Sequence, residues 1–546
     1  MANIFSNLDR PRVARSSLDL SHEYKSTFDM GQLVPISIME VLPGDVFRLG
    51  AAAVLRFQPM FAPILHRVKM RFYAFFTPYR ILWEDWEEFI TGGESGGSMP
   101  SIPLNDPNSY GGSVTSDNVI MRGNLWDYMG YAPVRWPSLA HYTTIVKNGV
   151  PHDLPRRAYV QIWNEYFRVP GIQAERGVPI NVASPVYKLL FKNWTRDYFT
   201  SALPFQQRGT SPALPIFGNA SAEFDTNVGL SGGGDVNLLI HQGVSGVPDF
   251  KIASGSVLNA KANLDAALDE NTVDISSLSS VDINDLRLAW QTQVWLERNA
   301  RGGARYTEQL QFRWGTRPLD ARLQRPEFIG GYSTDFLFSE VLQTSSTDAE
   351  PSPQGSMAGH GIAVNGGNLG SYRAEEHGCI IILACADPVP AYMDGVNRQW
   401  LRRTKFDFPS PEFVHLGEQE IFNAELGVLT DESSGGQYNR EPFGYTGIYN
   451  EMRYQPNIIT GEMRDVFDYW HLARILDPND LRNPGGGSGS AVPLNGEFLS
   501  IEHDLEKLKR IYAVQNVPGI IGSFGIKAHA VRPIPYMAIP SSIGGI

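Results

Sequence analysis

The chain has 546 residues, of which 19% are charged and 42% are hydrophobic, and its formal net charge at pH 7 is −12. This length allows a large buried core and suggests two to four domains, unless one β sandwich with long loops absorbs most of it. The acidic balance argues against nucleic-acid binding over the whole surface but leaves room for a local basic patch.

Glycine and proline are abundant, at 53 and 37 residues, and follow no repeat period. They predict frequent turns and long irregular connections. The charged fraction is below the usual quarter, which suits a subunit with several buried interfaces. The start, MANIFSNLDRPR, lacks the apolar stretch of a secretory signal. The longest apolar run, CIIILACA, has about eight residues and is too short to span a bilayer, so we expect no membrane insertion.

The N-terminal part predicts an arm followed by strands. Residues 1–17 are polar and indicate either an extended arm or a frayed terminus. The segment from Leu33 to Val41, LVPISIMEV, is typical of a strand and leads into a turn at Pro43 and Gly44. Residues 67–76 alternate polar and apolar and then become wholly apolar, as a strand entering a core does.

A further strand is predicted at residues 377–392, where a continuous apolar run is closed by proline. It carries the only two cysteines, Cys379 and Cys385. Positions six apart on a strand point to one face and lie roughly 20 Å apart, too far for a disulfide. We expect two buried free thiols, which fit a reducing cytoplasm.

Four segments change from alternating to helical spacing of their apolar residues. Glycine or proline follows each of them, as expected at helix ends. We expect these helices to lie outside the sheets of a β sandwich. They cover residues 81–90, 155–168, 282–301 and 464–476.

No motif indicates catalysis. Residues 93–97 fit G-x-S-x-G, but that hydrolase turn needs a strand before it and a helix after it, and here a predicted helix precedes it. The acids within residues 84–88 could bind Ca²⁺ or act as acid and base, yet on a helix they form a solvent or interface face. We predict no enzyme activity and no catalytic, cofactor-binding or metal-binding residue.

Several long strings resemble one family. They are LDLSHEYKSTFDMGQLVPISIMEVLPGDVF (18–47), FQPMFAPILHRVKMRFYAFFTPYRILWEDWEEFI (57–90), WTRDYFTSALPFQQRG (194–209), LERNARGGARYTE (296–308) and DARLQRPEFIGG (320–331). In this order they resemble the major capsid protein of the Microviridae, small single-stranded DNA phages, and in particular the gokushovirus-like branch. The resemblance covers most of the chain.

The resemblance implies a mainly β fold, a single eight-stranded antiparallel jelly roll whose long insertions carry the helices. It also implies a coat protein found in the virion and assembled in the cytoplasm of a bacterial host. Sixty copies would close a T=1 icosahedral shell around circular single-stranded DNA, through pentamers and threefold contacts. Further expected partners are a small basic DNA-packaging protein and other phage coat or pilot proteins.

Residues 210–280 depart from this pattern. They are rich in Gly, Ser, Ala and Asn and carry eight acidic side chains against Lys251 and Lys261. Short strand-like pieces such as VNLLI and VPDFKI favour a folded insertion over disorder. By analogy with gokushovirus-like coats, we expect a surface protrusion within the coat domain (18–546) that touches the host cell.

Basic clusters are the candidate DNA contacts, although each is also typical of a salt-bridged interface. Trp400 beside the last cluster adds base stacking to backbone neutralisation. An alternative function is a carbohydrate-binding or glycoside-processing jelly-roll module, which would be a monomer rather than a shell. The candidate DNA contacts are Arg10, Arg12, Arg15, Arg398, Arg402, Arg403 and Lys405; two further clusters are Arg156 with Arg157, and Arg298, Arg301 and Arg305.

Overall fold

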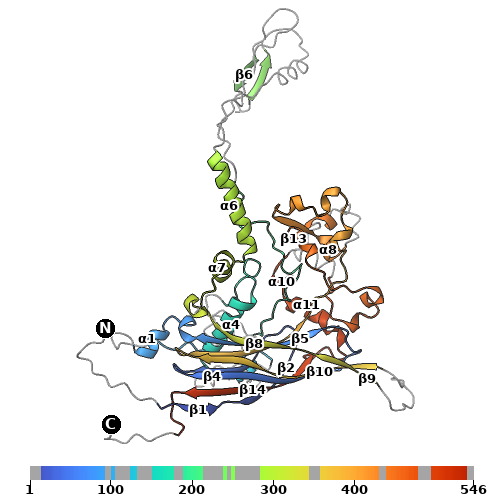
Figure 1. Cartoon of the computed structure of the whole chain (residues 1–546). Coiled ribbons are helices and arrows are strands. Elements are labelled where there is room, and N and C mark those ends of the chain that lie inside the picture. Colours follow the sequence, from blue (N-terminus) through green and yellow to red (C-terminus); the bar gives the residue numbers. More distant parts are fainter. Residues whose placement is uncertain are drawn as a thin grey trace, which may run out of the picture. The chain divides into compact units, whose positions relative to one another are not determined.

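The computed structural model describes residues 14–92, 100–104, 123–131, 151–177, 188–212, 238–242, 248–252, 283–342, 357–428, 438–476 and 494–537. Within them the chain is mainly β, and its sheets are antiparallel (Figure 1). It divides into two compact units: unit 1 comprises residues 1–206 and 300–546, and unit 2 comprises residues 207–299. No helix in the described ranges is long and apolar enough to cross a membrane.

Unit 1 is a β sandwich of two sheets that enclose one hydrophobic core. Its larger sheet has the strand order β1-β14-β4-β10-β9, with β2 also paired to β14. These strands are β1 (Ser16–Asp19), β2 (His22–Phe28), β4 (Val46–Phe57), β9 (Leu337–Leu342), β10 (Met357–Arg373) and β14 (Ile520–Arg532). Its smaller sheet has the order β3-β11-β5-β8, built from β3 (Val34–Val41), β5 (Val68–Pro78), β8 (Glu327–Asp335) and β11 (Gly378–Pro388).

The strands predicted from apolar patterning are confirmed at β3, β5 and β11. β11 lies between β3 and β5, and each of its residues is buried, which explains why its sequence is apolar throughout rather than alternating. The predicted turn between β3 and β4 contains Gly44 at a φ of 90°, a left-handed conformation that favours glycine. β1 begins at Ser16, two residues before the expected start of the coat domain.

Both cysteines are buried and free on β11. Burial raises the pKa of each thiol to about 12, so thiolate is scarce at neutral pH. We expect neither thiol to react with a thiol reagent in the native protein and both to react after denaturation. Ser371→Cys, on an exposed strand position, is the positive control. Stoichiometric labelling of the native wild-type chain would contradict the expectation.

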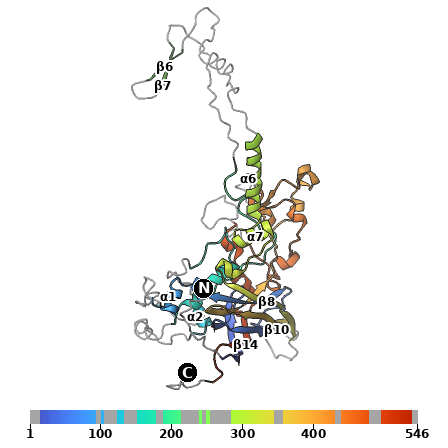
Figure 2. The same cartoon turned by 60° about the vertical axis from the view of Figure 1, so that its left-hand side comes forward.

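The helices of unit 1 lie outside the sheets, and α4, α7, α10 and α11 lie on the side of the smaller sheet (Figures 1 and 2). The predicted helix at 155–168 is confirmed as α4 (Leu154–Ile162), which continues as a π-helical turn to Phe167. The predicted helix at 81–90 is shorter, because α1 (Trp86–Thr91) begins only after a 3₁₀ turn, and Gly92 ends it with a φ of 85°. Further helices in the described part of unit 1 are α2 (Leu125–Tyr128), α7 (Tyr306–Trp314), α10 (Gly496–Leu499) and α11 (Ile501–Leu508).

The prediction of a helix at 464–476 is wrong. Only short 3₁₀ turns form there, at Gly461–Arg464 and Asp468–Trp470, and the chain then runs without helix to Leu476. The backbone of this segment bonds to distant partners instead: Leu65 N–H donates to the Trp470 carbonyl, and Arg474 N–H donates to the Ala391 carbonyl. Residues 471–474 are all buried, so no face remains for solvent.

A smaller lobe sits on the smaller-sheet side of unit 1 (Figures 1 and 2). We call it the β12–β13 lobe, after the hairpin of β12 (Glu418–Phe422) and β13 (Pro442–Gly447), with α8 (Asn423–Leu426) following β12. It has its own apolar cluster, which includes Tyr198, Phe199, Tyr392 and Ile421.

Unit 2 contains an antiparallel hairpin, β6 (Leu238–Gln242) with β7 (Pro248–Ile252), at two of the strand-like pieces expected from the sequence. It also contains most of α6 (Ile283–Arg301), which confirms the predicted helix at 282–301. Leu286, Leu288, Trp290 and Trp295 of α6 are at least half exposed. The helix therefore carries apolar side chains that a single copy leaves uncovered.

Candidate nucleic-acid interface

The basic cluster at 398–405 lies on the β12–β13 lobe, with Arg398 and Lys405 in two 3₁₀ turns (Arg398–Trp400 and Lys405–Asp407) and Arg402 and Arg403 between them. The Asn397 side chain accepts a hydrogen bond from Gln399 N–H and begins the first turn. Asp407 accepts hydrogen bonds from the N–H groups of Thr404 and Arg403, at 2.8 and 2.7 Å, and these bonds lower its pKa. Side-chain hydrogen bonds to the backbone therefore fix the conformation of this segment.

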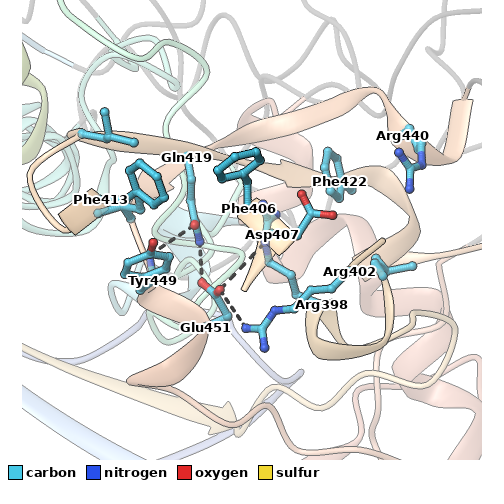
Figure 3. A pocket seen from close by; sticks show the side chains of 13 residues that line it. Arg398, Arg402, Phe406, Asp407, Phe413, Gln419, Phe422, Arg440, Tyr449 and Glu451 are labelled. Atoms are coloured by element: carbon cyan, nitrogen blue, oxygen red, sulfur yellow. Dashed lines mark hydrogen bonds and ion pairs between the residues drawn. The ribbon is translucent and has the colours of Figure 1, made fainter. Parts of the chain in front are cut away.

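Arg398 and Arg402 line a pocket of about 440 Å³ together with aromatic side chains (Figure 3). Arg398 Nη1 lies 2.8 Å from a Glu425 oxygen, and Arg402 Nη2 lies 3.4 Å from a Glu451 oxygen. Burial alone lowers the pKa of Arg398, but Glu425, with Tyr198 and Glu451, outweighs burial and the pKa is raised. These two arginines are therefore neutralised within the chain and hold the lobe together.

Arg403 and Lys405 remain exposed beside exposed aromatic rings. Phe406 is 66% and Trp400 75% exposed, and Lys405 Nζ lies 5.0 Å from the centre of the Phe406 ring. Free cations interleaved with aromatic faces suit single-stranded nucleic acid, which needs backbone neutralisation and base stacking. The same composition also suits a protein interface.

Residues 6–542 match the protein family described as Capsid protein (F protein). The chain belongs to this family. It is 32% identical to Capsid protein VP1 of Chlamydia phage 1, with 99% of this chain and 98% of that protein covered. It is 30% identical to Capsid protein VP1 of Bdellovibrio phage phiMH2K (99% and 98% covered) and 28% identical to that of Spiroplasma virus 4 (98% and 97% covered).

This capsid protein is therefore a structural component of a phage virion, of the gokushovirus-like Microviridae, and not an enzyme. The comparisons do not favour the carbohydrate-module alternative. The G-x-S-x-G string at 93–97 lies outside the described residues.

The structure does not bring Arg15 of the arm and the lobe cluster together. Arg10 and Arg12 lie outside the described residues, and Arg15 donates a hydrogen bond to the Gly44 carbonyl at 3.2 Å. Arg15 precedes β1 of the larger sheet, whereas the lobe lies on the side of the smaller sheet (Figure 1).

Other basic clusters of the coat protein have structural partners. Arg156 and Arg157 are buried and both pair with Asp153, at 2.5 and 2.9 Å. Arg305 pairs with Glu308 at 3.4 Å, and Arg301 pairs with Glu418 of β12.

Cations of the larger sheet were missed by the sequence reasoning. Arg48 and Arg56 lie on β4 and Lys527 lies on β14, at exposed positions that alternate with buried ones. The available signal was the period of two in VFRLGAAAVLRF and IIGSFGIKAHAVR, which places these cations on the solvent side of their strands.

Proposed function

We propose that sixty copies of this coat protein close a T=1 icosahedral shell around circular single-stranded DNA. Family membership carries the proposal. It is supported by large apolar side chains that one copy leaves exposed on unit 1, since such surface in a soluble protein marks sites of association. They include Leu65, Tyr306, Trp314, Leu337 and Trp400, all more than 65% exposed.

A jelly roll is the proposed fold of the sandwich. In support, the strands that neighbour one another are β2-β14-β4-β10 in one sheet and β3-β11-β5-β8 in the other. In each of these sheets, strands that are distant in sequence lie side by side, and the two sheets pack face to face. Two Greek keys in one sandwich give this arrangement. A rigid sandwich keeps its shape while its long connections are free to form contacts between copies.

The assembly proposal is tested on purified coat protein. We expect closed shells of uniform diameter in negative-stain images, and sedimentation as a shell or as pentamers rather than as a 60.6 kDa monomer. The physical reason is that several weak contacts per subunit add up when each copy has several neighbours. A chain that stays monomeric at high concentration and under phage production conditions would contradict the proposal.

The insertion at 210–280 is proposed as the outermost part of the particle, grouped around the threefold axes and touching the host surface. Its acidic composition supports an outward position, because packaged DNA would repel it. The exposed apolar side chains of α6, such as Leu288 and Trp290, support grouping, since neighbouring copies would bury what one copy exposes.

DNA contact by the arm and by the 398–405 cluster stays a prediction, and its members that are exposed in the described residues are Arg15, Arg403 and Lys405. The net charge of −12 supports a second partner, a small basic packaging protein that neutralises much of the genome.

A further inference from the structure

The larger sheet of unit 1 has a solvent-exposed side, which we call the open face. Its side chains alternate with those that enter the core: along β4, for example, Val54 is 46% exposed while Leu55 is fully buried. Val364 of β10 and Ile521 of β14, beside Val54 and Arg56 in the register, are also exposed, at 69% and 46%.

The pairing of the strands places several cationic side chains on this face. Arg48 lies opposite His529 of β14, and Arg56 lies opposite Ile521. Lys527 of β14 lies opposite Gly50, and Lys25 of β2 lies opposite Ser523. Arg373 of β10 lies opposite Val46. The open face thus carries Lys25, Arg48, Arg56, Arg373 and Lys527, drawn from four strands.

Acidic side chains are few on the open face. In the same register they are Asp19 of β1, opposite His529, and Glu23 of β2, opposite Gly525. Glu23 lies 3.5 Å from Lys25 Nζ. Within the part of the chain that the structure describes, Arg48, Arg56 and Lys527 have no ion pair. A chain with a net charge of −12 therefore has a basic face on which Lys25 is paired with Glu23, while no carboxylate of the described residues pairs with Arg48, Arg56 or Lys527.

Small residues separate these cations. Gly50, Ala52, Gly525 and Gly366 occupy the middle of the face, so no long side chain lies between the cations there. Arg48 and Arg56 are eight positions apart, or about 26 Å at ~3.3 Å per strand residue. Cations spread over such a distance suit an extended polyanion better than a single small anion.

One end of the face is hollowed into a groove of about 1090 Å³. Lys25, Arg56 and Asn516 line it beside the apolar Val54 and Ile521. Asp127 of α2, whose side chain accepts from Gly123 N–H, is also in the lining. A groove with cations along apolar side chains accepts a phosphate backbone together with its bases.

The open face is on the opposite side of unit 1 from the lobe (Figure 1). The chain leaves unit 1 for the insertion at the lobe: Leu203 exchanges backbone hydrogen bonds with Tyr445 of β13, and on the return Arg301 pairs with Glu418 of β12. If the lobe side of unit 1 faces outward, the open face turns toward the interior of the shell.

We infer that the open face is the surface on which the packaged single-stranded DNA lies, held through its phosphates by Arg48, Arg56, Lys527 and Lys25. The inference rests on the proposed shell and names the site of its nucleic-acid contact. It places the DNA on the side of unit 1 opposite to Arg403 and Lys405, so the two surfaces compete as the main interior contact.

The test compares phage particles that carry the triple variant Arg48→Gln, Arg56→Gln and Lys527→Gln with wild type. Their side chains have no ion pair to lose in the described chain, so we expect normal yields of shells. DNA per particle, from absorbance ratio and buoyant density, should fall several-fold. The single variants Arg56→Gln and Lys527→Gln should give smaller losses and serve if the triple variant does not fold.

Two matched variants locate the contact. Glu23→Gln removes an acid from the same face and should leave DNA content at or above wild type. Arg403→Gln with Lys405→Gln removes the exposed lobe cations and should leave it unchanged. Loss of DNA in the lobe variant, with normal content in the triple variant, overturns the inference in favour of the lobe.

A binding measurement on purified full-length coat protein gives a second readout. Its affinity for a single-stranded oligonucleotide should fall with salt, and neutralising three contacting cations should flatten the slope of log K against log salt by about 2. An unchanged slope, or loss of shells without loss of oligonucleotide binding, makes the open face a protein interface and overturns the inference. If wild-type particles hold no DNA, the proposed function itself fails.

Discussion

Deleting residues 210–280 should leave shell assembly intact and abolish infection. Both sheets and both apolar clusters that stabilise the sandwich and lobe lie in unit 1, whereas the deleted residues belong to unit 2. Assembly contacts on unit 1 therefore survive, while the surface proposed to touch the host is lost. Shells are counted by sedimentation and electron microscopy, and infection by plaque titre per particle.

The linker must be chosen from the local geometry of unit 2. Gly209 lies beside Leu296, since a Cβ placed there would be 3.5 Å from a Leu296 methyl group. Ile283, the first residue of α6, precedes Leu296 by thirteen residues, or about 20 Å at ~1.5 Å per residue. A linker of about eight residues spans this distance, at ~3.3 Å each.

A matched variant keeps the insertion and removes only its proposed grouping contacts. Leu288→Gln with Trp290→Gln replaces two exposed apolar side chains of α6, so the folding of one copy should be unaffected. We expect shells at normal yield with reduced infectivity. Normal infection by the deleted phage, or an image of the particle with the insertion inside the shell, would contradict the proposal.

Local patterning was sufficient for elements whose burial is simple. β11 is apolar because its side chains are buried on both faces of the sheet, and α6 has helical spacing and glycine after its end. Residues 464–476 had similar spacing, yet tertiary hydrogen bonds to Leu65 and Ala391 replaced the helical ones. Leu65 is hundreds of residues away from Trp470 in the sequence, so no local pattern predicts this hydrogen bond.

The candidate DNA contacts fall into two groups, those that a local sequence pattern shows and those that only the fold brings together. Arg398, Arg402, Arg403 and Lys405 are adjacent in sequence and easy to notice, but the fold pairs the first two with glutamates. The cations of the open face are spread over more than 500 residues, from Lys25 to Lys527, and only strand register brings them together. Charge runs are visible in a sequence, whereas a charged sheet face needs the pairing of its strands.

Replacing Arg474 with Met should destabilise the coat protein by about 3–5 kcal/mol, the usual result of breaking a buried ion pair. Arg474 is fully buried, and its Nε lies 2.9 Å from Asp504 of α11. Its Nη2 donates to the Phe498 carbonyl at 2.7 Å, and its guanidinium carbon is 4.2 Å from the centre of the Phe498 ring. Without Arg474, the buried Asp504 carboxylate loses its guanidinium partner and keeps the Trp194 N–H at 2.9 Å and His503 at 3.6 Å. Chemical denaturation of the unassembled protein measures the loss.

A double-mutant cycle separates this pair from simple packing. Arg474→Met with Asp504→Leu removes both charges, so most of the lost stability should return.

The dependence of stability on acid pH gives an independent check of the pair. Burial alone would raise the pKa of Asp504, but Arg474, with His503 and Lys507, outweighs burial and the pKa is lowered. The pair therefore contributes stability above the unfolded aspartate pKa of about 3.9, and this contribution is lost as the pH falls toward the lower folded value. The Arg474→Met variant should lose that part of the acid dependence. A single variant within about 1 kcal/mol of wild type, or a double variant no more stable than the single one, would show that the ion pair does not hold α11 against the core.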